Sequence, residues 1–174
     1  MRLKPVFETA RGQAAHRAAH EWPLPREPYL PGLTKRPDGD DDVHRIAALA
    51  PNPTDPLLWR ENVAYLAGFR LYGEGFGWEA HEVWEPVWMH AVPHTAERYL
   101  LQGLIQLANA RLKFAMKRER AGGRLLGIAA GLIEQASFAG GEEEVMGVDL
   151  PTLLRDTRLA SDMPGRTPEM HYNA

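Results

Sequence analysis

The segment GEGFGWEAHEVWEPVWMH, from Gly73 to His90, determines how the rest of the chain is interpreted. It holds three tryptophans, two histidines and four glutamates. Three glycines open it and disfavour an earlier helix, because glycine costs about 1 kcal/mol in a helix interior. We therefore predict a helix over residues 78–90 with one buried face. The apolar residues that recur at helical spacing are Ala80, Val83, Trp84, Val87 and Trp88.

The other side of this predicted helix carries titratable groups. At about 100° per residue, His81 and Glu85 share one edge beside Trp88, and Glu82 lies on their polar side. Pro86 has no N–H to give to the carbonyl of Glu82, so we expect a kink or a free carbonyl there. A histidine and a glutamate four residues apart can ligate one metal ion or form an oriented imidazole base. An ordinary solvent-facing ion pair has the same spacing, so both interpretations stay open.

A second informative helix is predicted over residues 96–118, where apolar residues occupy most of the circumference. The exceptions form a stripe of uncharged amides, which suits a half-buried position where donors and acceptors find partners. We predict that this stripe faces the polar edge of the helix over residues 78–90, although a plain solvent-facing stripe is the alternative. The expected pocket is lined by His81, Glu82, Glu85, Gln102, Gln106 and Asn109. Its expected metal ligands, for one divalent ion, are His81 and Glu85.

These two segments, LYGEGFGWEAHEVWEPVW and RYLLQGLIQLANARLKF, resemble the family of small helical proteins called domain of unknown function 309. The resemblance extends over residues 57–135, and its turn falls on residues 72–75. Gly73 departs from the pattern, since the family often has asparagine there. The resemblance implies packed antiparallel helices and no established activity. The positions that match the two helix motifs are Glu79, His81, Glu82, Glu85, Gln102, Gly103, Gln106 and Ala108.

Composition excludes several classes of site. The chain has 174 residues and no cysteine, so disulfides, thiolate metal sites and cysteine nucleophiles are absent. The formal net charge of -3 gives no electrostatic footprint for nucleic-acid binding. The start, MRLKPVFETARG, lacks the apolar core of a signal peptide, and no run reaches the roughly 18 apolar residues of a membrane span. We expect a cytoplasmic protein that does not bind membranes.

The N-terminal part, residues 1–54, is predicted to be a helix over residues 6–22 followed by an extended arm. Eight of the fourteen prolines lie between residues 22 and 56, interleaved with apolar side chains. Such an arm is expected to cover the helical core or a second subunit, and it motivates the prediction of a homodimer. His16 and His20 have the spacing of a zinc protease, but Arg17 stands where that chemistry needs glutamate.

The expected fold is all-α, an antiparallel bundle of four main helices over residues 55–72, 78–90, 96–118 and 120–138. These helices form a core domain, residues 55–140, followed by a segment, residues 141–174, with a short helix and a flexible tail. The expected function is binding of a metal ion or small ligand in the polar pocket, with enzymatic activity left open. The alternative is a non-catalytic structural or interaction protein whose polar cluster is an internal hydrogen-bond network.

Overall fold

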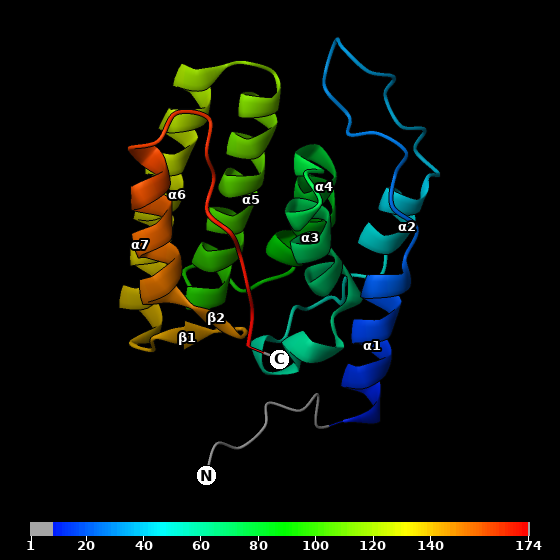
Figure 1. Cartoon of the computed structure of the whole chain (residues 1–174). Helices are drawn as coiled ribbons and strands as arrows, with labels where there is room; N and C mark the ends of the chain where they lie inside the picture. Colours follow the sequence, from blue (N-terminus) through cyan, green and yellow to red (C-terminus); the bar gives the residue numbers. More distant parts are fainter. Residues whose placement is uncertain (1–8, 174) are drawn as a thin grey trace.

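The computed structural model describes residues 9–173 and confirms an all-helical fold (Figure 1). The one sheet in this part of the chain is a two-stranded antiparallel hairpin of β1 (Glu144–Val145) and β2 (Val148–Asp149). A short 3-10 helix, η1, spans Pro56–Glu61. The α-helices are α1 (Ala10–Glu21), α2 (Asp42–Ala47), α3 (Val63–Gly73), α4 (Gly77–Met89), α5 (Ala96–Ala115), α6 (Glu119–Gly140) and α7 (Leu150–Ser161).

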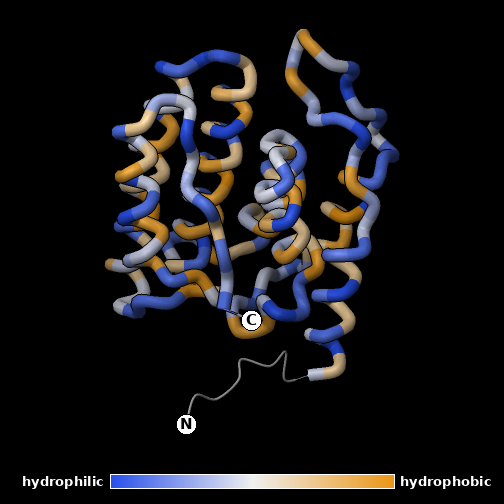
Figure 2. Tube along the Cα trace, viewed as in Figure 1, coloured by the Kyte–Doolittle hydropathy of each residue, from blue (hydrophilic) through white to orange (hydrophobic). Residues whose placement is uncertain are grey.

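Helices α3 to α6 form the centre of the molecule, with consecutive helices packed against each other. Helix α7 packs on α6, and α1 and α2 lie on the opposite side against α3 and α4 (Figure 1). Apolar and polar residues alternate along these helices (Figure 2), as expected for helices with one buried face. Within residues 9–173, none of the helices has the length and apolarity needed to cross a membrane.

Helix α4 packs between α3 and α5 and buries one face against them. The Trp84 side chain is fully buried, and its indole N–H donates to the Tyr65 carbonyl of α3 at 3.0 Å. Gly68 of α3 permits this contact, because a Cβ there would lie 2.2 Å from Trp84 Nε1. Gly77 lets the start of α4 approach α5, since its Cβ would lie 2.8 Å from the Ala108 carbonyl oxygen. The helix continues through Pro86 without interruption.

One expected helix differs from the structure. The helix expected over residues 55–72 is divided at Asn62, whose side-chain oxygen accepts the Tyr65 N–H at 3.0 Å and caps α3. The first part of the expected helix is the 3-10 helix η1, in which Leu58 is half exposed. Asparagine offers the backbone an alternative to a continuing helix, which explains the division. The start of the helix expected over residues 6–22 lies outside the described residues.

The C-terminal segment also differs from the flexible tail that its composition favours. After α7, residues 164–173 run back along the bundle without regular structure (Figure 1). The Tyr72 hydroxyl donates to the Pro168 carbonyl at 2.8 Å, and the Asn173 N–H donates to the Gly147 carbonyl at 2.7 Å. Met170 is buried. Tyr172 also packs on the core, but two isolated hydrophobic residues in a polar, proline-containing stretch give no periodic pattern, so the sequence did not indicate this packing.

Candidate metal centre

The polar edge of α4 brings three ligand-type side chains together. His81, Glu82 and Glu85 each offer one nitrogen or oxygen atom, and these three atoms lie within 4.8 Å of one another. His81 Nε2 and Glu85 Oε1 lie 3.8 Å apart. Helical spacing explains the arrangement, because residues three and four apart lie on the same face.

Asn109 of α5 fixes the orientation of the His81 ring. Its Oδ1 lies 2.9 Å from His81 Nδ1. A carbonyl oxygen only accepts hydrogen bonds, so a neutral His81 carries its proton on Nδ1 and keeps its lone pair on Nε2. That lone pair is on the nitrogen nearest Glu85. A histidine held through one nitrogen, with the other free, is the arrangement that metal-binding proteins use.

The other two amides of the predicted stripe are Gln102 and Gln106. Both are half-buried, as a position between the helices requires. Among residues 9–173, however, no hydrogen bond joins either side chain to the three α4 residues or to Asn109. The structure thus places Asn109 against His81, whereas a role for the two glutamines in a ligand pocket stays a prediction.

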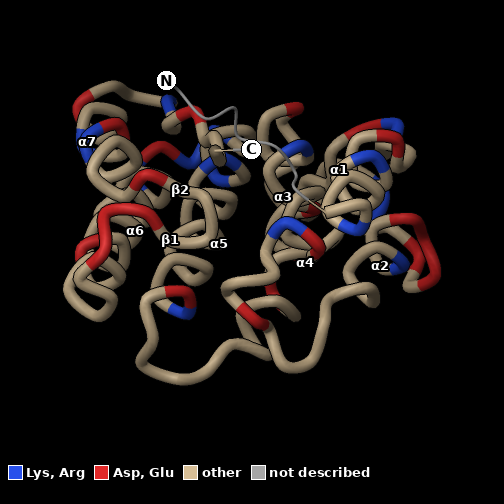
Figure 3. Tube along the Cα trace, turned by 90° about the horizontal axis from the view of Figure 1, so that it is seen from below, with Lys and Arg blue, Asp and Glu red and all other residues tan. Residues whose placement is uncertain are grey.

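A second histidine, His44 of α2, reaches the same edge from the N-terminal arm. Its Nε2 lies 3.9 Å from Glu82 Oε2, and its Nδ1 lies 2.8 Å from Asp41 Oδ1. Asp41 is the N-cap of α2, and the same oxygen accepts the His44 N–H at 2.9 Å. Acidic residues gather at this end of α2 (Figure 3). His44 could not be identified from the sequence, because no periodicity relates an arm to the helix on which it lies.

Glu79, on the first turn of α4, is buried rather than solvent-facing. The arm covers it, and the Tyr29 N–H donates to Glu79 Oε1 at 2.7 Å. Its other oxygen, Oε2, has no hydrogen-bond partner in the described part of the chain. Burial raises the pKa of the Glu79 carboxyl, and the charges of Asp41 and Glu82 raise it further. The polar residues of α4 have the spacing of a helix side exposed to solvent. The arm covers part of that side, so Glu79 is buried.

Burial and charge also act on Glu82. Burial raises the pKa of its carboxyl, as does the neighbouring charge of Glu85, whereas His81, His44 and Arg36 lower it. Carboxylates that are partly removed from water and lie close together repel one another. A bound cation would relieve this repulsion.

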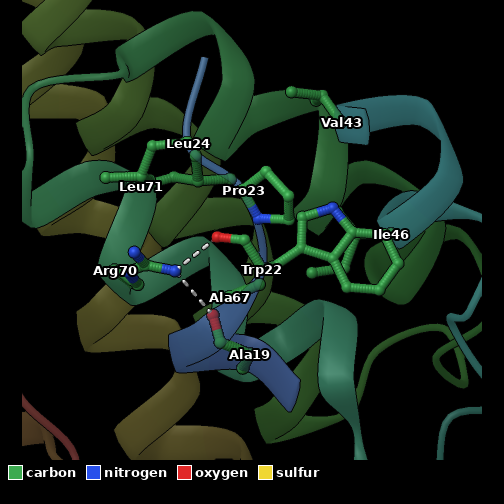
Figure 4. A pocket seen from close by; sticks show the side chains of 9 residues that line it. All are labelled: Ala19, Trp22, Pro23, Leu24, Val43, Ile46, Ala67, Arg70 and Leu71. Carbon is green, nitrogen blue, oxygen red and sulfur yellow. Dashed lines mark hydrogen bonds between the residues drawn. The ribbon is translucent and has the colours of Figure 1, made fainter. Parts of the chain in front are cut away.

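The arm itself is anchored on its own core. Arg70 Nη1 donates to the Trp22 carbonyl at 2.7 Å and to the Ala19 carbonyl at 3.3 Å (Figure 4). The recess beside these contacts is apolar and encloses about 10 Å³, which is room for about one water molecule. It is too small for a ligand and lies away from His81. The Tyr29 ring packs edge-on against Trp78 at 4.9 Å between centroids, which continues the contact onto α4.

Comparison with known proteins gives one match. No curated protein and no solved structure matches the chain. A family model does match, over residues 65–125, a range that contains most of α3, all of α4 and α5, and the beginning of α6. Both segments on which the family resemblance rests, residues 71–88 and 98–114, lie entirely within this range. The resemblance is therefore confirmed over residues 65–125, which match the domain of unknown function DUF309.

Proposed function

We propose that the chain binds one divalent first-row transition metal ion through His81, Glu82 and Glu85. The observation that carries this proposal is the grouping of one imidazole nitrogen and two carboxylate oxygens within 4.8 Å. Imidazole and carboxylate ligands suit zinc, manganese, nickel and iron(II). Three protein ligands leave a coordination position open to water or to a small ligand.

The separation of His81 Nε2 and Glu85 Oε1 supports the same proposal. At 3.8 Å it is too long for a hydrogen bond. Two ligand atoms about 2.1 Å from one tetrahedral ion lie about 3.4 Å apart. Small side-chain movements would therefore bring both atoms to bonding distance, and the Asn109 Oδ1 beside Nδ1 favours the tautomer that leaves Nε2 available for a metal ion.

A thermal-shift screen with zinc, manganese, nickel and iron(II) tests the proposal. A saturating ion, at about 100 times its dissociation constant, adds about 2.7 kcal/mol to the free energy of unfolding. For a chain of this length that raises Tm by about 5–10 °C. The screen is run on a His16→Ala background, because the His16 and His20 rings lie 4.1 Å apart and could bind metal themselves. No increase in Tm with any of the four ions would contradict the proposal.

The alternative function is structural, and one observation favours it. The hydrogen bond between His81 and Asn109 joins α4 to α5, so the polar group would fix how these helices pack. On this alternative, replacing His81 lowers the free energy of unfolding, and no metal ion changes Tm in the native chain. The same screen therefore distinguishes the two functions.

We also propose that the chain forms a homodimer. The N-terminal arm does not support a dimer, because it packs on the helical core of its own chain. The support comes from two large apolar side chains that are almost fully exposed, Phe138 at 89% and Leu57 at 86%. Light scattering is expected to give twice the chain mass of 19.5 kDa, reduced to one chain by Phe138→Ser. A mass of 19.5 kDa at every concentration of the native chain would refute the dimer.

A further inference from the structure

His44 and His81 are held in the same way on two sides of one acidic helix edge. Each ring has its Nδ1 next to an oxygen acceptor, Asp41 Oδ1 at 2.8 Å for His44 and Asn109 Oδ1 at 2.9 Å for His81. Each ring then has Nε2 near an α4 carboxylate, at 3.9 Å from Glu82 and 3.8 Å from Glu85. Two rings from separate parts of the chain thus have matching orientations.

This arrangement has a chemical consequence. When Nδ1 donates its proton to an oxygen, a neutral ring presents a lone pair at Nε2. A lone pair and a carboxylate oxygen are both acceptors, so they repel unless a cation lies between them. Distances of 3.8 and 3.9 Å are too long for hydrogen bonds and leave room for an ion that bonds to both atoms.

We infer that His44 Nε2 is a second imidazole ligand of the proposed metal ion, with Asp41 as the residue that orients it. The inference rests on the proposed function. Glu82 is the link, because it belongs to the three-residue group on α4 and is also the carboxylate nearest His44. A carboxylate that accepts the distal N–H of a metal-bound histidine fixes the ring and raises its basicity.

His44 differs from the α4 ligands because it belongs to the arm. Its Nε2 is outside the group whose ligand atoms all lie within 4.8 Å, so ion binding has to draw α2 toward α4. Helix α2 has six residues and is held to the core by the buried Val43 and Ile46, so binding would draw the His44 side chain inward through a small shift of this helix. The metal ion would then bind the arm to the core and complete a ligand set of two imidazoles and two carboxylates.

Counting imidazoles tests this directly. Copper(II) bound to the His16→Ala chain is examined by pulsed electron paramagnetic resonance, which detects the remote nitrogen of each coordinated imidazole. Two imidazoles are expected in this chain and one in the same chain carrying His44→Ala. Since His44 is half exposed, the replacement should leave the fold intact. His94→Ala removes an exposed histidine far along the sequence, between α4 and α5, and is expected to leave the count at two.

Zinc affinity tests the role of Asp41, and hydrogen exchange tests whether the ion holds the arm. Asp41→Asn is expected to weaken zinc binding by about 10–100-fold. Zinc is expected to slow hydrogen exchange of residues 42–47 in the His16→Ala chain, and not when His44→Ala is added.

The outcomes separate this inference from the proposed function. One coordinated imidazole, lost with His81→Ala and unaffected by His44→Ala, would overturn the inference and leave the metal site on α4. Copper binding that neither His81→Ala nor Glu85→Ala weakens would refute the metal site itself.

Discussion

Gly68→Ala is expected to lower the free energy of unfolding by about 2–6 kcal/mol. The new Cβ would lie 2.2 Å from Trp84 Nε1, and the tryptophan is fully buried, so neither group can move into solvent. Overpacking of this kind costs about 1–3 kcal/mol. Displacing the indole also breaks its hydrogen bond to Tyr65 and leaves a buried donor unpaired, at a further cost of about 1–3 kcal/mol. Chemical denaturation measures the loss.

Gly73→Ala is the matched control, because it makes the same change at the end of the same helix. A Cβ at Gly73 meets nothing within 4 Å, and the residue is exposed. Alanine favours the helix by up to about 1 kcal/mol, so the control is expected to be neutral or stabilising. Equal losses at the two glycines would show that Trp84 does not occupy the space that Gly68 leaves.

The combined replacement of His81 and Glu85 by alanine is expected to abolish stabilisation by metal. In the His16→Ala chain, zinc at about 100 times its dissociation constant should raise the free energy of unfolding by about 2.7 kcal/mol. Without two of the three proposed ligands, this increase should fall to nearly zero. The variant should also lose stability without zinc, because Asn109 Oδ1 loses its partner, which costs about 1–3 kcal/mol. Denaturation with and without zinc gives both quantities.

The chain contains a matched control for this variant. His171 and Glu169 form another histidine–glutamate pair, at 3.5 Å, whose side chains are largely exposed. Replacing both with alanine removes the same two residue types away from α4. The control should retain the full effect of zinc, and a control that loses it would show that zinc stabilises the chain through surface groups.

The helices around α4 could be predicted from local patterns. The glycine turn and the apolar spacing after it identified α4, and the amides among apolar residues identified a polar stripe on α5. Of this stripe, Asn109 lies against His81, with its Oδ1 2.9 Å from Nδ1, and the place of the two glutamines in a pocket stays a prediction. These features depend on neighbours within one or two helical turns, and such short-range periodicity is what a single sequence reveals best.

The N-terminal side of the site could not be predicted in the same way. Whether Glu79 is buried and whether His44 lies near Glu82 depend on the path of an extended arm rich in proline. That path is set by contacts such as Arg70 with the Trp22 carbonyl, which join residues far apart in the sequence. Asp41 caps the start of α2 through a local contact, whereas the partner of His44 on α4 is beyond any local pattern.

Calorimetric titration of zinc into the His16→Ala chain, after treatment with a chelator, tests the central claim most directly. The account predicts saturable binding of one zinc ion per chain, with the heat lost when His81→Ala and Glu85→Ala are added. Absence of binding, or binding that the two replacements leave unchanged, would contradict a metal site on the polar edge of α4.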